Sequence, residues 1–279
     1  MQKICDLHTH SVYSDGTLTP AELIDQAINS GLSALAMTDH NTVSGLQDFI
    51  DSAAGKPIDI VPGVEFTTAD NGTELHILGL FVQPAKFDKV KEYINRASIL
   101  KEESNYKLVN KLRKIGYDIR YLDILENSKG HVNRANIAAE LLKKGYIKSI
   151  SEGFETILSK SYGLYEPPER LSATETITFI RSIGAVAVWA HPYIHMNFEQ
   201  ADEFLPRAKA AGLQGMETIY SLYDDETTRK AKEVCARFEL CESGGSDFHG
   251  ANKPDISLGK GKGNLVIPYE FYETLRSLL

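Results

Sequence analysis

The chain is poor in the features that build disulfide-linked and membrane-spanning proteins. Its 279 residues include three cysteines and one tryptophan. Cys5, Cys235 and Cys241 form no Cys-x-x-Cys pair, so we expect no disulfide framework. No run of about 18 apolar residues occurs, which argues against a transmembrane helix. Because the expected first strand begins by residue 4, we also expect no secretory signal, and hence a reduced, cytoplasmic protein.

The chain also lacks an excess of positive charge. Its formal net charge is −8, which argues against a protein that coats long nucleic acids. The charge is unevenly distributed: residues 84–171 hold 17 Lys and Arg against 12 Asp and Glu, a net of +5, which leaves −13 for the remainder. An acidic body with a basic insert suits an anionic substrate if the acidic part binds metal ions. The alternative is that the charges of the insert only solvate its helices.

Both ends of the chain alternate short apolar runs with amphipathic segments. A helix is expected from Thr19 to Gly31, because Thr19 and Glu22 match a capping box with Pro20 at the first helical position. A second helix is expected over 43–54. The expected strands include 34–37, 58–65, 75–81, 185–190, 215–220, 240–246 and 263–267. Such alternation is typical of parallel α/β structure.

The middle of the chain reads differently. One or two long helices are expected over 86–115, and shorter ones over 136–144 and 151–158. Strand-like runs are scarce there. We therefore expect an α/β barrel domain formed by residues 1–83 and 172–279, with a mostly helical insertion, 84–171, covering the active site.

Imidazoles and carboxylates recur where the apolar runs end. In α/β barrels the loops that follow the strands gather at one end, so these groups are expected to meet. Any single histidine is more often a hydrogen-bonded core residue, and His131 is expected to be an ordinary loop residue. The recurrence is what indicates a shared site. The candidate metal ligands are His8, His10, Asp15, His40, Glu65, His76, His191, Asp247 and His249.

This donor set suits Zn, Mn or Fe better than Ca or Mg alone. Nine groups exceed the needs of one site, so we expect two or three divalent ions that share a bridging carboxylate. Ions ~3.5–4 Å apart can activate a bridging hydroxide and hold phosphoryl oxygens for in-line displacement. The residue pattern therefore favours a metal-dependent hydrolase.

Five segments resemble the successive motifs of one family, the PHP (polymerase and histidinol phosphatase) superfamily. They are His8-Thr9-His10 with Asp15-Gly16, Thr38-Asp39-His40, Pro62-Gly63-Val64-Glu65, Ala190-His191-Pro192 and Ser246-Asp247-Phe248-His249. The insertion resembles that of the branch containing 3′,5′-nucleoside bisphosphate phosphatases and a 5′-to-3′ exoribonuclease. The resemblance implies a distorted (β/α)7 barrel with a trinuclear metal site.

The resemblance also implies a role for each ligand. His8, His10, Glu65 and Asp247 would hold one metal. Glu65 would bridge to a second metal, held with His76 and His191. The third would be held by Asp15, His40 and His249. Asp15, His40, Glu65 and His249 are the residues to which we assign catalysis.

The substrate side departs from the family pattern. Relatives often carry Arg-x-x-Arg-Asn where this chain has Lys101-Glu102-Glu103-Ser104-Asn105, and Arg-Pro-His where it has Arg134-Ala135-Asn136. We expect Lys101, Asn105 and Arg134 to bind substrate, although Arg134 could be a plain surface charge. His195 is expected to line the pocket, with a solvated loop histidine as the alternative.

Two carboxylates near the ligands have weaker expected roles. Asp39 would either orient a ligating imidazole or cap the following helix. Glu217 ends an apolar run as the ligands do, but the resemblance gives it no metal, so a structural role is expected.

Three functions are compatible with these residues. The first is a phosphoesterase that uses a metal-bridging hydroxide on a small phosphorylated molecule, such as a 3′,5′-nucleoside bisphosphate or a short oligonucleotide end. The second is an amidohydrolase-like enzyme that cleaves a C–N or C–O bond. The third is a non-catalytic metal-binding scaffold. No long nucleic acid, membrane or protein partner is expected.

Overall fold

The computed structural model describes residues 3–127, 132–168 and 170–279, so His131 lies outside the described residues. The chain forms two compact units. Met1–Glu92 and Leu171–Leu279 form the first, here called the barrel unit. Tyr93–Arg170 form the second, the helical unit. In the described part of the chain, no helix is long and apolar enough to cross a membrane.

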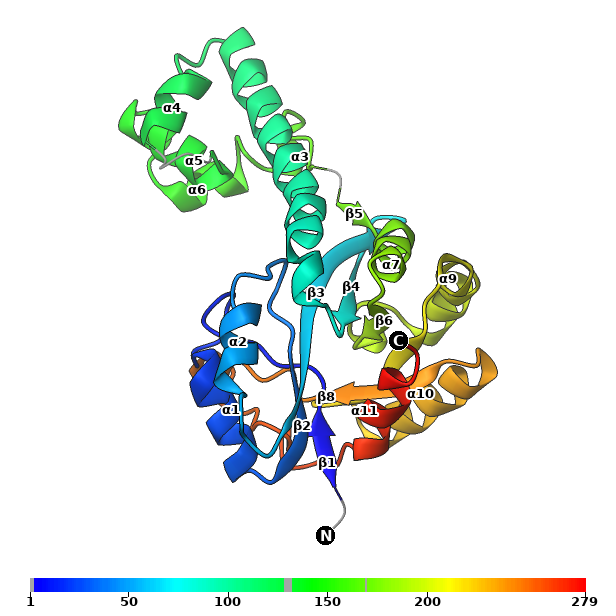
Figure 1. Cartoon of the computed structure of the whole chain (residues 1–279). Coiled ribbons are helices and arrows are strands. Elements are labelled where there is room, and N and C mark those ends of the chain that lie inside the picture. The colour runs from blue at the N-terminus through cyan, green and yellow to red at the C-terminus, as the bar shows by residue number, and fades with distance from the viewer. Residues whose placement is uncertain (1–2, 128–131, 169) are drawn as a thin grey trace. The chain divides into compact units, whose positions relative to one another are not determined.

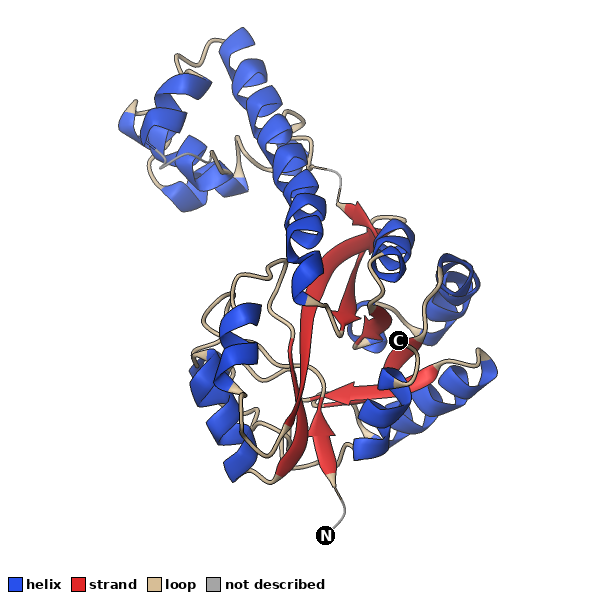
Figure 2. Cartoon of the chain, viewed as in Figure 1, coloured by secondary structure: helices blue, strands red, loops and turns tan. Residues whose placement is uncertain are grey.

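Seven strands of the barrel unit follow one another around a single sheet (Figures 1 and 2). In sheet order they are β1 (Ile4–Asp6), β2 (Leu32–Met37), β3 (Asp59–Asp70), β4 (Thr73–Leu80), β6 (Val186–Ala190), β7 (Gly215–Tyr220) and β8 (Cys241–Gly245). The two-residue β5 (Leu171–Ser172) pairs with β3. β4 is antiparallel to both of its neighbours, and the other pairs along this path are parallel. The mixed α/β fold with a distorted barrel is therefore confirmed.

The two ends of this sheet nearly close on each other. Leu7 N donates to Gly244 O at 3.1 Å, and His10 N donates to Phe248 O at 2.9 Å. Asp247 N donates to His8 O, also at 2.9 Å. The first strand therefore continues as a paired segment beside the end of the last one. This closure brings the first residues of the chain next to residues 244–248.

Helices flank the barrel strands. They are α1 (Pro20–Asn29), α2 (Leu46–Ser52), α7 (Ala173–Ser182), α8 (Pro192–His195), α9 (Phe198–Ala211), α10 (Asp225–Arg237) and α11 (Tyr269–Arg276), with short 3-10 turns η1 (Pro84–Lys86) and η3 (Gly250–Asn252). The expected capping box is present: Thr19 N donates to Glu22 Oε2 at 2.9 Å, and Glu22 N to Thr19 Oγ1 at 3.4 Å. Apolar side chains such as Leu7, Val61 and Val188 form a buried hydrophobic core of this unit.

Three expectations for this unit are wrong in detail. The strand containing Glu65 does not stop there but runs to Asp70, turns at Asn71 and Gly72 in the left-handed region, and returns as β4. Strand–helix alternation is therefore interrupted by a hairpin. α2 begins at Leu46 and not at residue 43. Residues 263–267 form no strand: Leu265 N donates to Lys260 O at 3.2 Å in a turn, and Cys5 N donates to Ile267 O at 3.0 Å.

The helical unit has its own hydrophobic core. A single helix, α3 (Phe87–Lys114), replaces the one or two expected and continues into this unit from the barrel unit. It is followed by α4 (Tyr121–Asn127), α5 (Arg134–Lys143), α6 (Ile150–Glu155) and the 3-10 turn η2 (Lys160–Tyr162). α4 was not expected from the sequence. The core of this unit includes Leu108, Leu112, Ile137, Leu141 and Leu158, all fully or almost fully buried.

Candidate metal centre

The nine predicted ligands all belong to the barrel unit and converge in one region. Their positions follow from the strands. His8 and His10 lie just after β1, His40 after β2, His191 after β6, and Asp247 and His249 after β8. Asp15 lies in the loop before α1. The expectation that Glu65 ends a strand is wrong, because it lies inside β3; His76 lies inside the adjacent β4, as expected.

Glu65 is the centre of the cluster and is fully buried. Its Oε2 atom lies 3.2 Å from Nε2 of His8, 3.2 Å from Nε2 of His10 and 3.1 Å from Nδ1 of His40. Its other oxygen, Oε1, lies 2.7 Å from His76 Nδ1 and 3.1 Å from His191 Nε2. The two oxygens thus face different sets of imidazoles, as a carboxylate placed between two cations would.

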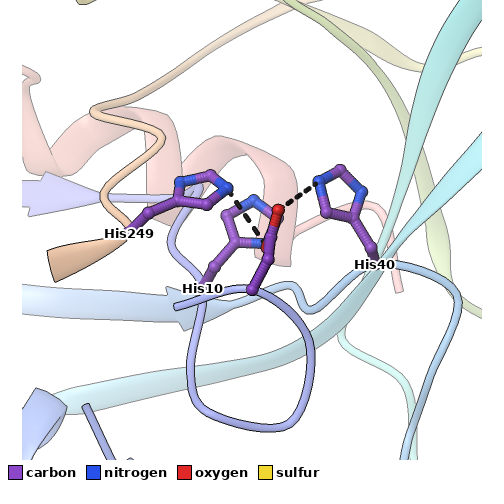
Figure 3. A group of neighbouring side chains, drawn as sticks. His10, His40 and His249 are labelled. Carbon is purple, nitrogen blue, oxygen red and sulfur yellow. Dashed lines mark ion pairs between the residues drawn. The ribbon is translucent and has the colours of Figure 1, made fainter. Parts of the chain in front are cut away.

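Two further carboxylates complete the ring of donors. Asp247 Oδ1 lies 3.2 Å from His10 Nε2 and 3.7 Å from His8 Nε2. Asp15 Oδ1 lies 3.2 Å from His249 Nε2, and its Oδ2 lies 3.7 Å from His40 Nε2. Figure 3 shows the rings of His10, His40 and His249 turned toward one another. The Asp15 side chain is 54% exposed, so solvent reaches the cluster on its side.

The innermost atoms of this cluster fit metal ions. His8 Nε2, His10 Nε2, His40 Nδ1 and Glu65 Oε2 are buried and lie at ion-pair distance from one another, but within the described part of the chain none of them makes a contact with hydrogen-bond geometry. A buried polar atom without a partner costs about 1–3 kcal/mol, so several facing one point are unfavourable unless a cation binds there. Four overlapping groups of donors have spacing suited to a metal, and the mixture of imidazole and carboxylate suits Zn, Mn or Fe.

The electrostatics of the site keep its carboxylates ionised. Burial opposes ionisation of Glu65 and Asp247, but the surrounding histidines outweigh it and hold both carboxyl pKa values well below their usual range. Burial likewise disfavours charge on His10, yet Asp247 and Glu65 raise its pKa to about 9. The His249 imidazole behaves in the opposite way, because burial lowers its pKa to about 4. Glu65 and Asp247 are thus charged and available to a cation at neutral pH.

Glu217 has a role beyond the one its sequence position suggested. It is fully buried, and its Oε1 accepts a hydrogen bond from His8 Nδ1 at 3.0 Å. Its Oε2 accepts from the backbone N–H of His191 at 2.6 Å. A donor bond from Nδ1 leaves Nε2 of His8 to face the cluster, which is how outer carboxylates orient metal-binding histidines. One carboxylate thus positions two predicted ligands.

Asp39 and Asp6 support the site through backbone and hydroxyl groups. Asp39 accepts from Ser11 N at 2.8 Å and from the hydroxyls of Ser11 and Ser14, both at 2.6 Å, so it holds the loop that carries Asp15. Asp39 does not cap the helix that follows, because the N-cap of α2 is Gly45, and among the described residues it reaches an imidazole only through Ser14, whose Oγ lies 3.5 Å from His10 Nδ1. Asp6 accepts from Ser246 N at 2.9 Å, next to Asp247. Asp6 is a functional residue outside the predicted set, although the alternation that links His8 and His10 extends to it.

The expected substrate contacts are split between the two units. Lys101 is an exposed residue of α3, and Asn105 is buried with its Nδ2 donating to Val132 O at 2.9 Å. The Arg134 guanidinium lies over the ring of Tyr165, 4.2 Å from its centre. These three belong to the helical unit. His195 belongs to the barrel unit, where its ring is 5.2 Å from that of His76.

Comparison with known proteins identifies the family. The PHP domain model matches residues 6–164, which is more than half of the chain. The chain belongs to the PHP domain family. Over 258 residues it is 31% identical to a 5′-3′ exoribonuclease of Haemophilus influenzae, covering 89% of this chain and 91% of the relative.

Other PHP relatives agree with this placement. A 3′,5′-nucleoside bisphosphate phosphatase of Chromobacterium violaceum is 28% identical, covering 91% of this chain and 90% of its own length. A solved structure from Bifidobacterium adolescentis, provisionally named a metal-dependent phosphoesterase, is 26% identical with a TM-score of 0.67, covering 99% of this chain and 96% of that one. This PHP protein is therefore a metal-dependent phosphoesterase, which confirms the expected enzyme class.

Proposed function

We propose that this PHP phosphoesterase removes a terminal phosphate from a small nucleotide, such as a 3′,5′-nucleoside bisphosphate, or cleaves the terminal phosphodiester of a short oligonucleotide. The observation that carries the proposal is the placement of Glu65, whose two oxygens face separate sets of imidazoles. Relatives named for a bisphosphate phosphatase and for an exoribonuclease support this class of substrate.

Two or three divalent ions, Mn, Zn or Fe, would be held by the nine ligands. His8, His10, Glu65 and Asp247 would hold the first, and Glu65 would reach the second together with His76 and His191. Asp15, His40 and His249 would hold the third. When bound, such ions lower the pKa of water and neutralise charge that develops on a phosphoryl group.

The chain's own residues would then orient the substrate. Asp15 and His40, with side chains 54% and 27% exposed, mark the side from which a phosphate can approach the cluster. Burial lowers the pKa of His40 and brings that of His249 to about 4, so both imidazoles are neutral and offer lone pairs at neutral pH. Each can therefore serve as a ligand without first losing a proton.

A pocket beside Asp247 could take part of a small substrate. Its volume is about 230 Å³, and Asp247 forms part of its lining. Tyr220 donates to Asp247 Oδ2 at 2.8 Å, and Lys253 Nζ lies 2.7 Å from the same oxygen. Leu222 and Ile256 add apolar surface, and Lys262 adds a second positive charge. The lining also contains Asp255, so the pocket combines apolar walls with groups of both charges.

The helical unit offers a second place for an anion. Arg134 lies over the ring of Tyr165, and the face of its guanidinium is thereby occupied while its N–H edge can still bind a phosphate. We propose that Arg134 and the exposed Lys101 bind an anionic part of the substrate. Asn105 has its amide donor bonded to Val132 O, so its contribution is to support this unit.

Three cysteine thiols are free, and two of them are buried. A reduced state suits the cytoplasm, which is the location we propose.

The test is phosphate release by purified protein loaded separately with Mn, Zn or Fe. The panel contains adenosine 3′,5′-bisphosphate, mononucleotides, sugar phosphates, histidinol phosphate and short 5′-phosphorylated RNA. We expect the bisphosphate or the RNA end to react with the highest kcat/KM, and chelation to abolish the reaction. Amide and lactone substrates provide the comparison for the hydrolase alternative.

The outcome separates the class of reaction from the choice of substrate. If phosphate were released efficiently from sugar phosphates alone, the proposed nucleotide substrate would be wrong. The altered residues of the insertion would then have changed the choice of substrate. Hydrolysis of amides without phosphate release from any ester would overturn the phosphoesterase chemistry itself.

A further inference from the structure

A third imidazole stands beside the pair formed by His76 and His191. His195 ends the short helix α8, which begins directly after His191. His191 directly precedes this helix with a left-handed backbone, and its ring nevertheless lies close to that of His195. The ring centres form a nearly equilateral triangle: 5.1 Å from His76 to His191, 5.2 Å from His76 to His195, and 5.6 Å from His191 to His195.

The donor atoms of this triangle have metal-like spacing. One ring nitrogen from each of the three histidines lies within 4.8 Å of the others. Nitrogens about 2.0–2.1 Å from a tetrahedral zinc ion are about 3.3 Å apart, so small rotations of the side chains would complete the geometry. Glu65 Oε1 lies beside two of these rings, 2.7 Å from His76 Nδ1 and 3.1 Å from His191 Nε2.

We propose that His195 is a tenth metal ligand, which binds the same ion as His76 and His191. The inference rests on the proposed metal centre and extends it, because the family resemblance assigns only nine ligands and we first expected His195 to touch substrate. The ion at this position would have three imidazole ligands. This donor set favours Zn, Fe or Co over Mn.

The surroundings of the triangle support this role. His191 is held in place from outside the triangle, because Glu217 Oε2 accepts its backbone N–H at 2.6 Å. His191 also has a φ of 29°, in the left-handed region that non-glycine residues rarely adopt. Such strain persists where surrounding contacts enforce it and is common at functional sites. The start of α8, and with it the direction in which His195 projects, is thus fixed by the same buried carboxylate that orients His8.

The experiment measures cobalt binding by the full chain, independently of catalysis. Metal-free wild-type protein and the His195→Ala variant are titrated with Co²⁺ against a competing chelator, while the visible ligand-field spectrum is recorded. We expect His195→Ala to weaken the binding of one ion at least tenfold and to change its spectrum, leaving the remaining ions unaffected. His76→Ala, which removes a ligand of the same ion, should affect the same step of the titration.

Two further variants make the result specific. Ile194→Ala changes an exposed neighbour on the same helical turn and should leave every binding step unchanged. His195→Cys should restore the weakened step and add a thiolate-to-cobalt charge-transfer band, which only direct coordination can produce. This band remains informative even if His195→Ala lowers the stability of α8.

The contrary results are equally clear. Unchanged cobalt affinities and spectrum in His195→Ala, with no charge-transfer band in His195→Cys, would overturn the inference. A raised KM with unchanged ion binding would assign His195 to the substrate instead. If wild-type protein binds no cobalt at all, the proposed metal centre is refuted as a whole. If wild-type protein binds cobalt but the His195 substitutions change neither affinity nor spectrum, only the assignment of His195 as a ligand is refuted.

Discussion

The protonation of individual histidines controls how tightly this site can bind metal. Asp247 and Glu65 raise the pKa of His10 to about 9, and the His8 pKa is raised well above its usual value by Glu65 and Glu217. Without metal, both imidazoles therefore hold a proton on the nitrogens that face the cluster at pH 7. A metal ion must displace these protons, because only the neutral imidazole is a ligand.

Metal binding should consequently release protons and strengthen with pH. Because the folded-state pKa of His10 is about 9, we expect the apparent affinity to rise from pH 6 to about pH 9 and then level off. Calorimetric titrations with Mn²⁺ or Zn²⁺ in buffers of different ionisation enthalpy would count the protons released at pH 7 and at pH 9.5. Equal, near-zero release at both pH values would contradict the assigned protonation states.

Single ligands should be essential for turnover. We expect His40→Ala and Asp247→Ala each to lower kcat at least ~100-fold, because charge stabilisation by the held ions is lost. Circular dichroism should show an intact fold. Asp51→Ala, which removes an exposed carboxylate of α2, is the matched control and should retain normal activity. Near-normal rates in both ligand variants would refute their roles.

Glu217 should act on metal affinity through the ligands it holds. Glu217→Gln keeps the size of the side chain but removes the charge opposite His8 Nδ1, and we expect metal affinity to fall about 10–100-fold. Equilibrium dialysis followed by metal analysis measures this effect. Glu226→Gln, on the exposed face of α10, is the control that should bind metal normally. Undiminished metal content in Glu217→Gln would show that the hydrogen bond only supports packing.

At the scale of secondary structure, the close approach of β8 to β1 sets a limit on side-chain size. A Cβ atom on Gly245 would overlap the Cβ of His8 and lie 2.7 Å from its backbone nitrogen. Gly245→Ala should therefore push the two strands apart, lowering the melting temperature and the metal content together. Thermal unfolding and metal analysis test this expectation.

Gly55 supplies the matched control for that substitution. It has a φ of 75°, and a Cβ atom added there would meet no other atom within 4 Å. Gly55→Ala should therefore cost only about 1 kcal/mol of conformational strain and leave the metal content unchanged. Equal losses from the two substitutions would mean that backbone conformation, and not strand contact, governs the effect at Gly245.

The elements that the sequence predicts well are those with local signals. Thr19, Pro20 and Glu22 predict the start of α1, and glycines mark the ends of several helices. The hairpin between β3 and β4 was missed because apolar runs do not reveal strand direction, and only the turn at Asn71 and Gly72 indicates it. The strand expected over 263–267 fails because an apolar run needs a partner along its length, and here only Ile267 and its neighbour reach β1.

The candidate site was predictable for a different reason. Histidines and carboxylates that recur after buried runs can be read from the sequence, so the nine candidate ligands were found together. Glu217 could not be assigned its role, because the contact that defines it joins residues 209 positions apart. The same holds for His195, whose neighbour His76 lies on a distant strand. Contacts that depend on barrel closure leave no local pattern.

At the scale of the whole molecule, the two units have separate hydrophobic cores, and only one contains the candidate ligands. Ligands that bind the native state stabilise it by mass action, by about 4 kcal/mol at 1,000 times the dissociation constant. For a barrel unit of about 200 residues this corresponds to a rise of roughly 8–16 °C in its melting temperature.

In differential scanning calorimetry, added metal should therefore shift the unfolding transition of the barrel unit alone. Addition of Mn²⁺ or Zn²⁺ should raise the barrel transition and leave that of the helical unit unchanged, and chelator should reverse the shift. The Asp247→Ala variant is the control, because its barrel transition should respond much less. A single transition that moves as a whole would show that the two units unfold together.

Closure of the sheet between residues 7–10 and 244–248 has a consequence for how the protein is made. His8 and His10 are synthesised well before Asp247 and His249. A nascent chain that lacks β8 therefore lacks the candidate ligands Asp247 and His249. Termination before that point should yield a product with an incomplete metal site.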